Sequence, residues 1–179
     1  MHDFIEEVLL TNEEIVAIAE RIGKQISHDY AGKKPLLIGL LKGSVPFLAE
    51  LMKHIDIEME VDFMKVSSYS GVHSTGAVTI TKDTSTPLVN RDIIIVEDIV
   101  DSGLTIQEIK NLLKDRKAKS IRVATLLDKP SGRTVPNLYP DYVGQEIPGK
   151  FVVGFGLDYD ELYRNLPYVG VLKRSVYEK

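Results

Sequence analysis

The chain has 179 residues, with 22 basic and 26 acidic side chains, a net charge of −4 and 44% hydrophobic residues. This length and composition fit one globular domain and exclude both a disordered chain and a basic nucleic-acid coat. No apolar run approaches the ~20 residues that span a bilayer, the first ten residues carry acidic side chains, and cysteine is absent. We therefore expect a cytoplasmic protein with neither disulfides nor a membrane partner.

The first expected element is an amphipathic helix from Thr11 to Tyr30. Thr11 and Glu14 have the spacing of a capping box, which marks a helix start. Apolar side chains recur at the helical period on one face: Ile15, Ile18, Ala19, Ile22 and Ile26.

A strand, a tight loop and a second helix are predicted next. Residues 36–41 are a short apolar run after Pro35, and Ser44 and Pro46 are typical of the start of a helix, which would end near His54. Apolar and acidic residues then alternate over residues 57–63. That alternation predicts a strand with one solvated face, near an edge of a sheet.

Residues 67–86 are rich in serine, threonine and glycine, and only residues 78–80 resemble a strand. This composition predicts a long mobile loop. Loops of that length are uncommon inside compact domains and are often lids.

Two further apolar strands, at residues 93–96 and 121–127, flank a segment with one apolar helical face, formed by Ile106, Ile109, Leu112 and Leu113. Apolar strands that alternate with amphipathic helices predict an α/β fold with a mainly parallel sheet covered on both faces. Two short strands at residues 151–153 and 169–172 would form a small appended lobe.

The residues after the strand at 93–96 are the strongest candidates for a binding site, because ligands of parallel sheets bind beyond the carboxyl ends of the strands. Asp101, Ser102 and Gly103 would open a helix, and the free N–H groups of such a turn suit a phosphate. Glu97 and Asp98 could bind sugar hydroxyls or Mg²⁺. Alternatively, Asp101 or Ser102 only caps the helix and the acids are solvated. Two acids that end a buried strand favour the binding site.

The sequence V-E-D-I-V-D-S-G-L-T at residues 96–105 resembles the phosphoribosyl diphosphate signature of the type I phosphoribosyltransferases. The resemblance covers nearly the whole chain and is specific to the bacterial hypoxanthine-guanine phosphoribosyltransferases. Other segments that carry it are L-K-G-S at 41–44, S-Y at 68–69, L-D-K-P at 127–130, F-V-V-G-F-G-L-D-Y at 151–159, and Arg164.

The resemblance implies the type I phosphoribosyltransferase fold, in which a mainly parallel central sheet is flanked by helices and accompanied by a small hood lobe and a flexible lid loop. We expect one domain over residues 1–179. Its core would comprise about residues 30–130, and the hood would comprise the N-terminal segment and about residues 140–179.

The resemblance also implies roles for the residues around the signature. Glu97 and Asp98 would hold the ribose hydroxyls and Mg²⁺. Asp101 would face N7 of the purine as the proposed general base. The 5′-phosphate would be wrapped by Asp101, Ser102, Gly103, Leu104 and Thr105, although Leu104 stands where some members carry lysine.

Pyrophosphate would be held by the backbone of Lys42, Gly43 and Ser44, in a loop that often contains a non-proline cis peptide in this family. Ser44 replaces a glycine that other members carry. Asp158 would bind a second Mg²⁺, and Arg164 would contact pyrophosphate.

The purine would be recognised by residues from three further segments. Lys129 would donate to O6, Phe151 would stack on the base, and the backbone of Val152 would read its Watson–Crick edge. Ser68 and Tyr69 would open the lid. Taken singly, Lys129, Phe151 and Tyr69 could equally be a surface charge, a core residue and an exposed loop aromatic, but their joint placement favours the site.

The predicted activity is the transfer of the 5-phosphoribosyl group from phosphoribosyl diphosphate to hypoxanthine or guanine, with Mg²⁺, by a homodimer or homotetramer. The alternative is a regulator of the same fold that senses phosphoribosyl diphosphate and binds nucleic acid. Such a regulator needs a basic face, which the net charge of −4 disfavours. The complete set Asp101, Lys129, Asp158 and Arg164 also favours the enzyme.

Other catalytic and binding motifs are missing from the sequence. It has no G-x-x-x-x-G-K-[ST] loop and no G-x-S-x-G elbow, and Gly154-x-Gly156 lacks the third glycine of a dinucleotide fingerprint at Tyr159. The four histidines lie far apart in sequence, at His2, His28, His54 and His73. We therefore expect them to be surface or packing residues instead of metal ligands.

Overall fold

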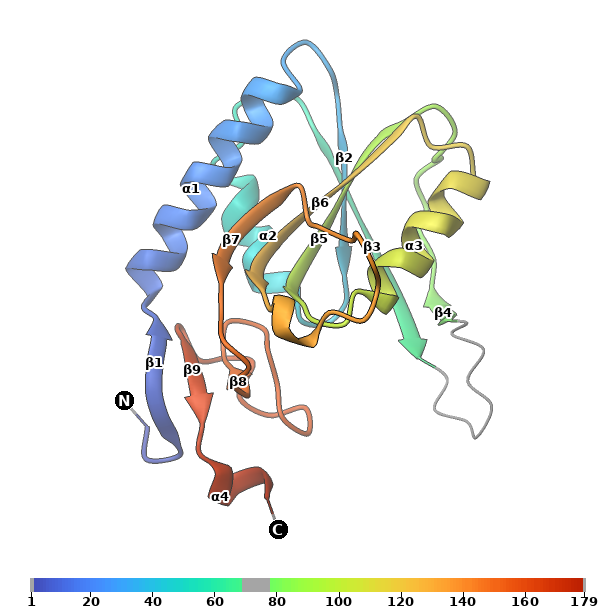
Figure 1. Ribbon diagram of the computed structural model, residues 1–179. Helices are drawn as coiled ribbons and strands as arrows, with labels where there is room; N and C mark the ends of the chain where they lie inside the picture. The colour runs from blue at the N-terminus through green and yellow to red at the C-terminus, as the bar shows by residue number, and fades with distance from the viewer. Residues whose placement is uncertain (1, 69–77, 179) are drawn as a thin grey trace.

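A six-stranded sheet lies at the centre of the computed structural model, which describes residues 2–68 and 78–178 (Figure 1). Its strand order is β4-β3-β2-β5-β6-β7, and only β4 runs antiparallel to its neighbour. The strands are β2 (Leu36–Leu40), β3 (Glu60–Ser68), β4 (Val78–Lys82), β5 (Asp92–Val100), β6 (Ser120–Asp128) and β7 (Tyr142–Glu146). The mainly parallel sheet predicted from the apolar runs is confirmed.

Helices cover both faces of this sheet (Figure 1). The helices α1 (Asn12–Asp29) and α2 (Val45–Met52) pack on one face and α3 (Leu104–Asp115) on the other. In β5, Ile94 contributes to the first of these two cores and Ile95 to the second. Because the central strands β2, β5 and β6 are buried on both faces over much of their length, their sequences contain continuous apolar runs that do not alternate.

The capping box predicted at the start of α1 is present. The Thr11 hydroxyl accepts a hydrogen bond from the Glu14 N–H at 3.2 Å, and the Thr11 N–H donates to the Glu14 carboxylate at 2.8 Å. The α1 helix begins and ends within one residue of the predicted bounds.

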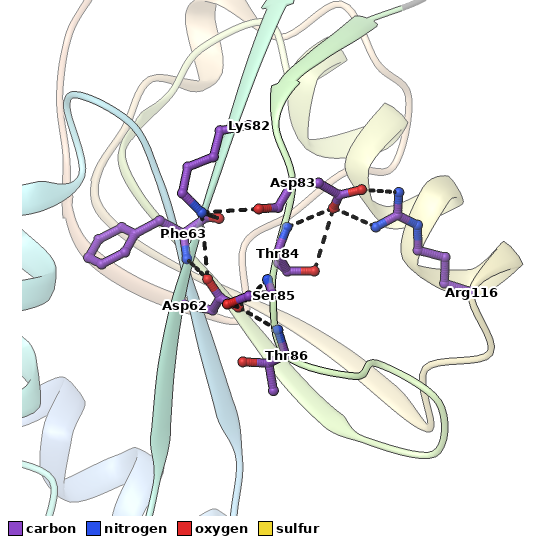
Figure 2. A network of polar contacts seen from close by, with 8 residues as sticks. All are labelled: Asp62, Phe63, Lys82, Asp83, Thr84, Ser85, Thr86 and Arg116. Carbon is purple, nitrogen blue, oxygen red and sulfur yellow. Dashed lines mark hydrogen bonds and ion pairs between the residues drawn. The ribbon is translucent and has the colours of Figure 1, made fainter.

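The prediction for residues 57–63 is wrong in position and in burial. The strand β3 begins only at Glu60, and Asp62, placed on a solvated face by the alternation, is buried. Its carboxylate accepts backbone N–H groups from Phe63 at 2.7 Å and from Ser85 and Thr86 at 2.8 Å each (Figure 2). Burial alone would raise the pKa of Asp62, but these hydrogen bonds lower it to about 2.

The second half of the loop predicted over residues 67–86 is ordered by the sheet. The strand β4 pairs with β3, and the Lys82 ammonium donates to the Phe63 carbonyl at 2.9 Å (Figure 2). Asp83 accepts two hydrogen bonds from Arg116, the residue after α3, at 2.6 and 2.7 Å. At the start of the loop predicted over residues 67–86, Ser67 and Ser68 belong to β3, and residues 69–77, where most of the lid was expected, lie outside the described residues.

A small antiparallel sheet, in the order β1-β9-β8, lies beyond the carboxyl ends of the strands of the large sheet (Figure 1). It comprises β1 (Ile5–Leu10), β8 (Val152–Val153) and β9 (Val169–Leu172) and is followed by the short helix α4 (Arg174–Tyr177). A single 3₁₀ turn, η1 (Pro130–Gly132), follows β6. The strands at 151–153 and 169–172 were predicted, whereas β1 and β7 were not.

The strand β7 places residues 142–146 in the large sheet, although the hood was expected from about residue 140. The α1 helix likewise packs on the large sheet. Within the described part of the chain, no helix is both long and apolar enough to cross a membrane.

Candidate active site

The strand β5 continues beyond residue 96, where the sequence predicted its end, and the two candidate acids lie in this extension. Glu97 and Asp98 lie within β5, and the turn Asp101–Gly103 then leads into α3. Gly103 has a φ of +83°, in the left-handed region that side chains disfavour, so glycine suits this turn. A pocket of about 130 Å³ opens here, lined by Glu97, Ile99, Val100, Asp101, Ser102, Gly103, Thr105 and Ile106.

Glu97 and Asp98 place two carboxyl groups in a poorly solvated setting. Burial, together with the charge of Asp98, raises the pKa of Glu97 well above its usual value, and burial also raises the pKa of Asp98. Asp98 lies against the loop after β2, where a Cβ on Gly43 would be 1.8 Å from its Oδ2 atom. A bound cation would favour the ionised form of both acids, and their hard oxygen atoms fit Mg²⁺.

Asp101 and Lys129 are brought together from the ends of β5 and β6. The Lys129 Nζ atom lies 3.3 Å from Asp101 Oδ2. The backbone also links the ends of these two strands, because the Lys129 N–H donates a hydrogen bond to the Val100 carbonyl at 3.0 Å. The predicted general base and the predicted O6 donor are thus direct neighbours.

Two residues that the sequence reasoning missed hold Asp101 in place. Arg133 donates from Nε to the Asp101 carbonyl at 2.8 Å and also contacts the Asp128 carboxylate. A Cβ on Gly132 would lie 1.6 Å from Asp101 Oδ1, so the carboxylate occupies the space that a side chain would fill. The only sequence signal was the position of Gly132 and Arg133 just beyond the end of β6.

The loop after β2 contains a cis peptide between Leu41 and Lys42, as the resemblance implied. Ser44 is fully buried, and its hydroxyl makes no hydrogen bond within the described residues. The hood packs directly on this loop, since a Cβ on Gly156 would be 1.9 Å from the Gly43 carbonyl oxygen. Glycine at position 156 therefore permits close approach of the two backbones.

The connection from β8 to β9 contributes Asp158 and Arg164. The Arg164 guanidinium donates to the Gly156 carbonyl at 2.7 Å and lies 3.0 Å from the Asp158 carboxylate. A further acid, Glu161, pairs with Lys42 at 2.6 Å and with Arg164 at 3.3 Å. Sequence reasoning gave Glu161 no role, because it lies two residues outside the family-like stretch at 151–159.

Phe151 presents a half-exposed ring beside β8. It stacks on Tyr177 with ring centroids 4.8 Å apart and an interplanar angle of 25°. The strand β8 is an edge strand, and the Phe151 carbonyl accepts from the Leu172 N–H of β9. Because pairing alternates along an antiparallel edge, the backbone N–H and C=O of Val152 face outward, away from β9.

Not every predicted site residue can be placed. Ser68 is the last residue of β3, and Tyr69 and His73 lie outside the described residues. No group of three or more acidic or histidine side chains converges as a metal cluster within residues 2–68 and 78–178. A larger pocket of about 440 Å³ lies by Asp29 and Tyr142, at the opposite end of the strands.

A family model described as the phosphoribosyl transferase domain matches residues 7–160. The chain belongs to the phosphoribosyltransferase family.

Within that family, the hypoxanthine-guanine phosphoribosyltransferase of Streptococcus mutans is 56% identical over 176 residues, which are 98% of this chain and 97% of that protein. The enzyme of the same name from Streptococcus pyogenes is 55% identical with the same coverage. These relatives place the chain in the hypoxanthine-guanine branch.

Solved structures agree with this placement. A hypoxanthine phosphoribosyltransferase from Staphylococcus aureus has a TM-score of 0.96 and 49% identity and covers 100% of this chain and 97% of its own. A variant of the Trypanosoma cruzi hypoxanthine phosphoribosyltransferase, complexed with its product IMP, has a TM-score of 0.93 and 37% identity, with 99% and 96% covered. The type I phosphoribosyltransferase fold and an enzymatic role are thereby confirmed.

Proposed function

We propose that the carboxyl ends of β2, β5 and β6 bind phosphoribosyl diphosphate, Mg²⁺ and a 6-oxopurine for a purine salvage reaction. The enzyme transfers the 5-phosphoribosyl group to hypoxanthine or guanine and releases IMP or GMP with pyrophosphate. The reaction is that of the relatives, whereas the residue roles below are our assignments.

The contact between Asp101 and Lys129 is the main support for assigning Asp101 as the general base and Lys129 as the donor to O6 of the purine. A 6-oxopurine presents N7 and O6 on one edge. Asp101 offers an acceptor and Lys129 offers donors only, and the two groups lie 3.3 Å apart. Asp101 would accept the N7 proton and Lys129 would donate to O6, while the Phe151 ring stacks on the base and Val152 reads its far edge.

Displacement of pyrophosphate from a ribosyl carbon passes through an oxocarbenium-like state. The enzyme must neutralise the leaving anion, hold the ribose and keep water away. The turn before α3, from Asp101 to Thr105, would bind the 5′-phosphate at a helix N-terminus. Lys42 and Arg164 would contact the pyrophosphate, together with the backbone of Gly43 and Ser44.

Mg²⁺ would be held by Glu97 and Asp98, and a second ion by Asp158. When bound, the metal offsets the negative charge of pyrophosphate and of the buried acids. Few protein ligands converge at any one point within the described residues, so substrate oxygens and water would complete the coordination, as is usual for Mg²⁺ at phosphates.

Turnover with each purine tests this proposal. The purified enzyme, phosphoribosyl diphosphate and Mg²⁺ are mixed with hypoxanthine, guanine, xanthine or adenine in turn, and nucleotide formation is followed. We expect IMP and GMP to form, activity to cease with excess chelator, and Mg²⁺ or Mn²⁺ to restore it. Full activity in excess chelator would contradict the metal assignment, and comparable use of adenine would contradict the base assignment.

The proposal extends to a cytoplasmic homodimer or homotetramer. Val45 and Met52 on α2 support association because both are apolar residues that are more than two fifths exposed. Light scattering during size-exclusion chromatography measures the mass directly, and a monomer would contradict this part.

A further inference from the structure

Glu161 is at the tip of a tight hairpin in the connection from β8 to β9. Tyr159 and Leu162 exchange backbone hydrogen bonds at 3.1 and 3.0 Å. The two residues between them, Asp160 and Glu161, have φ values of +51° and +66°. Two successive left-handed residues closed by an antiparallel bridge form a type I′ turn, so the backbone sets the direction in which the Glu161 side chain leaves the turn.

The Glu161 carboxylate bridges two cations from different parts of the chain. Its Oε2 atom lies 2.6 Å from the Lys42 Nζ atom, and its Oε1 atom lies 3.3 Å from a terminal nitrogen of Arg164. Its backbone N–H donates to the Asp158 carboxylate at 2.9 Å. Each oxygen of this carboxylate thus contacts one of the two cationic side chains that we assign to pyrophosphate binding.

The bridge is solvent-exposed, so it is weak enough to break. The side chains of Lys42 and Glu161 are 52% and 61% exposed, and exposed ion pairs contribute little to stability. Pyrophosphate carries more negative charge than a carboxylate and offers several acceptor oxygens to the same donors. It can therefore replace Glu161 on both cations.

We propose that Glu161 is an internal anion that occupies the pyrophosphate subsite of the free enzyme and is displaced by the pyrophosphate group of the substrate. This inference depends on the proposed function, which assigns Lys42 and Arg164 to pyrophosphate. By competing for these cations, Glu161 weakens pyrophosphate binding and favours its release after transfer. If Glu161 instead positioned Lys42 for the ligand, its removal would weaken binding.

The variant Glu161→Gln tests the proposal, because it keeps the shape and the backbone contacts but removes the charge. Calorimetric titration with inorganic pyrophosphate and Mg²⁺ should give a Kd about three- to tenfold lower than that of the unmodified enzyme, the size expected from relief of two exposed ion pairs. The KM for phosphoribosyl diphosphate should fall in parallel, while the KM for hypoxanthine stays within twofold.

Asp160→Asn is the matched control. It removes the same charge from the same turn, and Asp160 makes no ion pair with any described residue. Its Kd should change by less than twofold. An unchanged or raised Kd in Glu161→Gln, with pyrophosphate binding to the unmodified enzyme, would overturn the inference alone. No binding to the unmodified enzyme would overturn the pyrophosphate assignment as well.

Discussion

Gly132 is the residue whose enlargement would most directly misplace the proposed general base. In Gly132→Ala, the new Cβ would lie 1.6 Å from Asp101 Oδ1, while real Cβ contacts are not shorter than 3.0 Å. The carboxylate must therefore move by at least about 1.4 Å. Misplacement of a reacting group by about 1 Å costs ~10²-fold in rate, so we expect kcat to fall by about that factor.

Stability should change little, because the Asp101 side chain is 48% exposed and can swing into solvent. Steady-state kinetics with hypoxanthine, together with thermal melting, separates these effects. Gly149→Ala is the control, since its Cβ would meet only the Ser131 hydroxyl, at 3.3 Å. A Gly132→Ala enzyme with normal kcat, or one that loses kcat only because it melts, would refute the proposed role of the Asp101 position.

The centre of the large sheet could be predicted from the sequence, because strands that are buried on both faces appear as continuous apolar runs. The apolar runs match β2 and β6 closely, whereas β5 continues four residues past its apolar run, to Val100. The strands β1 and β7 were missed because each mixes apolar and polar residues, and β1 also pairs with β9, near the other end of the chain. Asp62 was misplaced for a related reason, since the backbone donors that satisfy it come from residues 85 and 86.

Some residues of the candidate site could likewise be predicted from the sequence, whereas several of its contacts could not. Asp101 and Lys129 could be named because they follow apolar strands, and parallel strands bring their ends together. The contact of Gly132 with Asp101, the stacking of Tyr177 on Phe151 and the bridge from Glu161 to Lys42 depend on side-chain directions in irregular segments. Neither periodicity nor a short motif encodes those directions.

Three further variants test the remaining assignments. Asp101→Asn keeps the shape but cannot accept a proton, so kcat should fall ~10²-fold or more while phosphoribosyl diphosphate still binds; near-normal turnover at saturating substrates would exclude Asp101 as the base. Lys129 has donors only, and a mismatched buried group can reject a substrate by ~10⁴-fold. The variant Lys129→Gln should therefore lose activity on hypoxanthine, and competition kinetics should show a smaller preference for hypoxanthine over adenine. An unmodified enzyme that uses adenine within tenfold of hypoxanthine would show that Lys129 does not read the 6-position. Asp62→Asn addresses the fold beneath the site. The pKa of Asp62 is about 2 in the folded chain, below its ordinary value of 3.8, a difference that corresponds to about 2 kcal/mol in the free energy of unfolding. Because the folded-state pKa is lowered, this stabilisation is fully present above pH 4 and disappears as the pH falls through 2. Urea unfolding of both proteins should therefore show a difference of about 2 kcal/mol in the free energy of unfolding at pH 7, and this difference should become smaller below pH 4. A difference that is independent of pH would show that the loss of stability comes from packing instead of from the carboxylate charge.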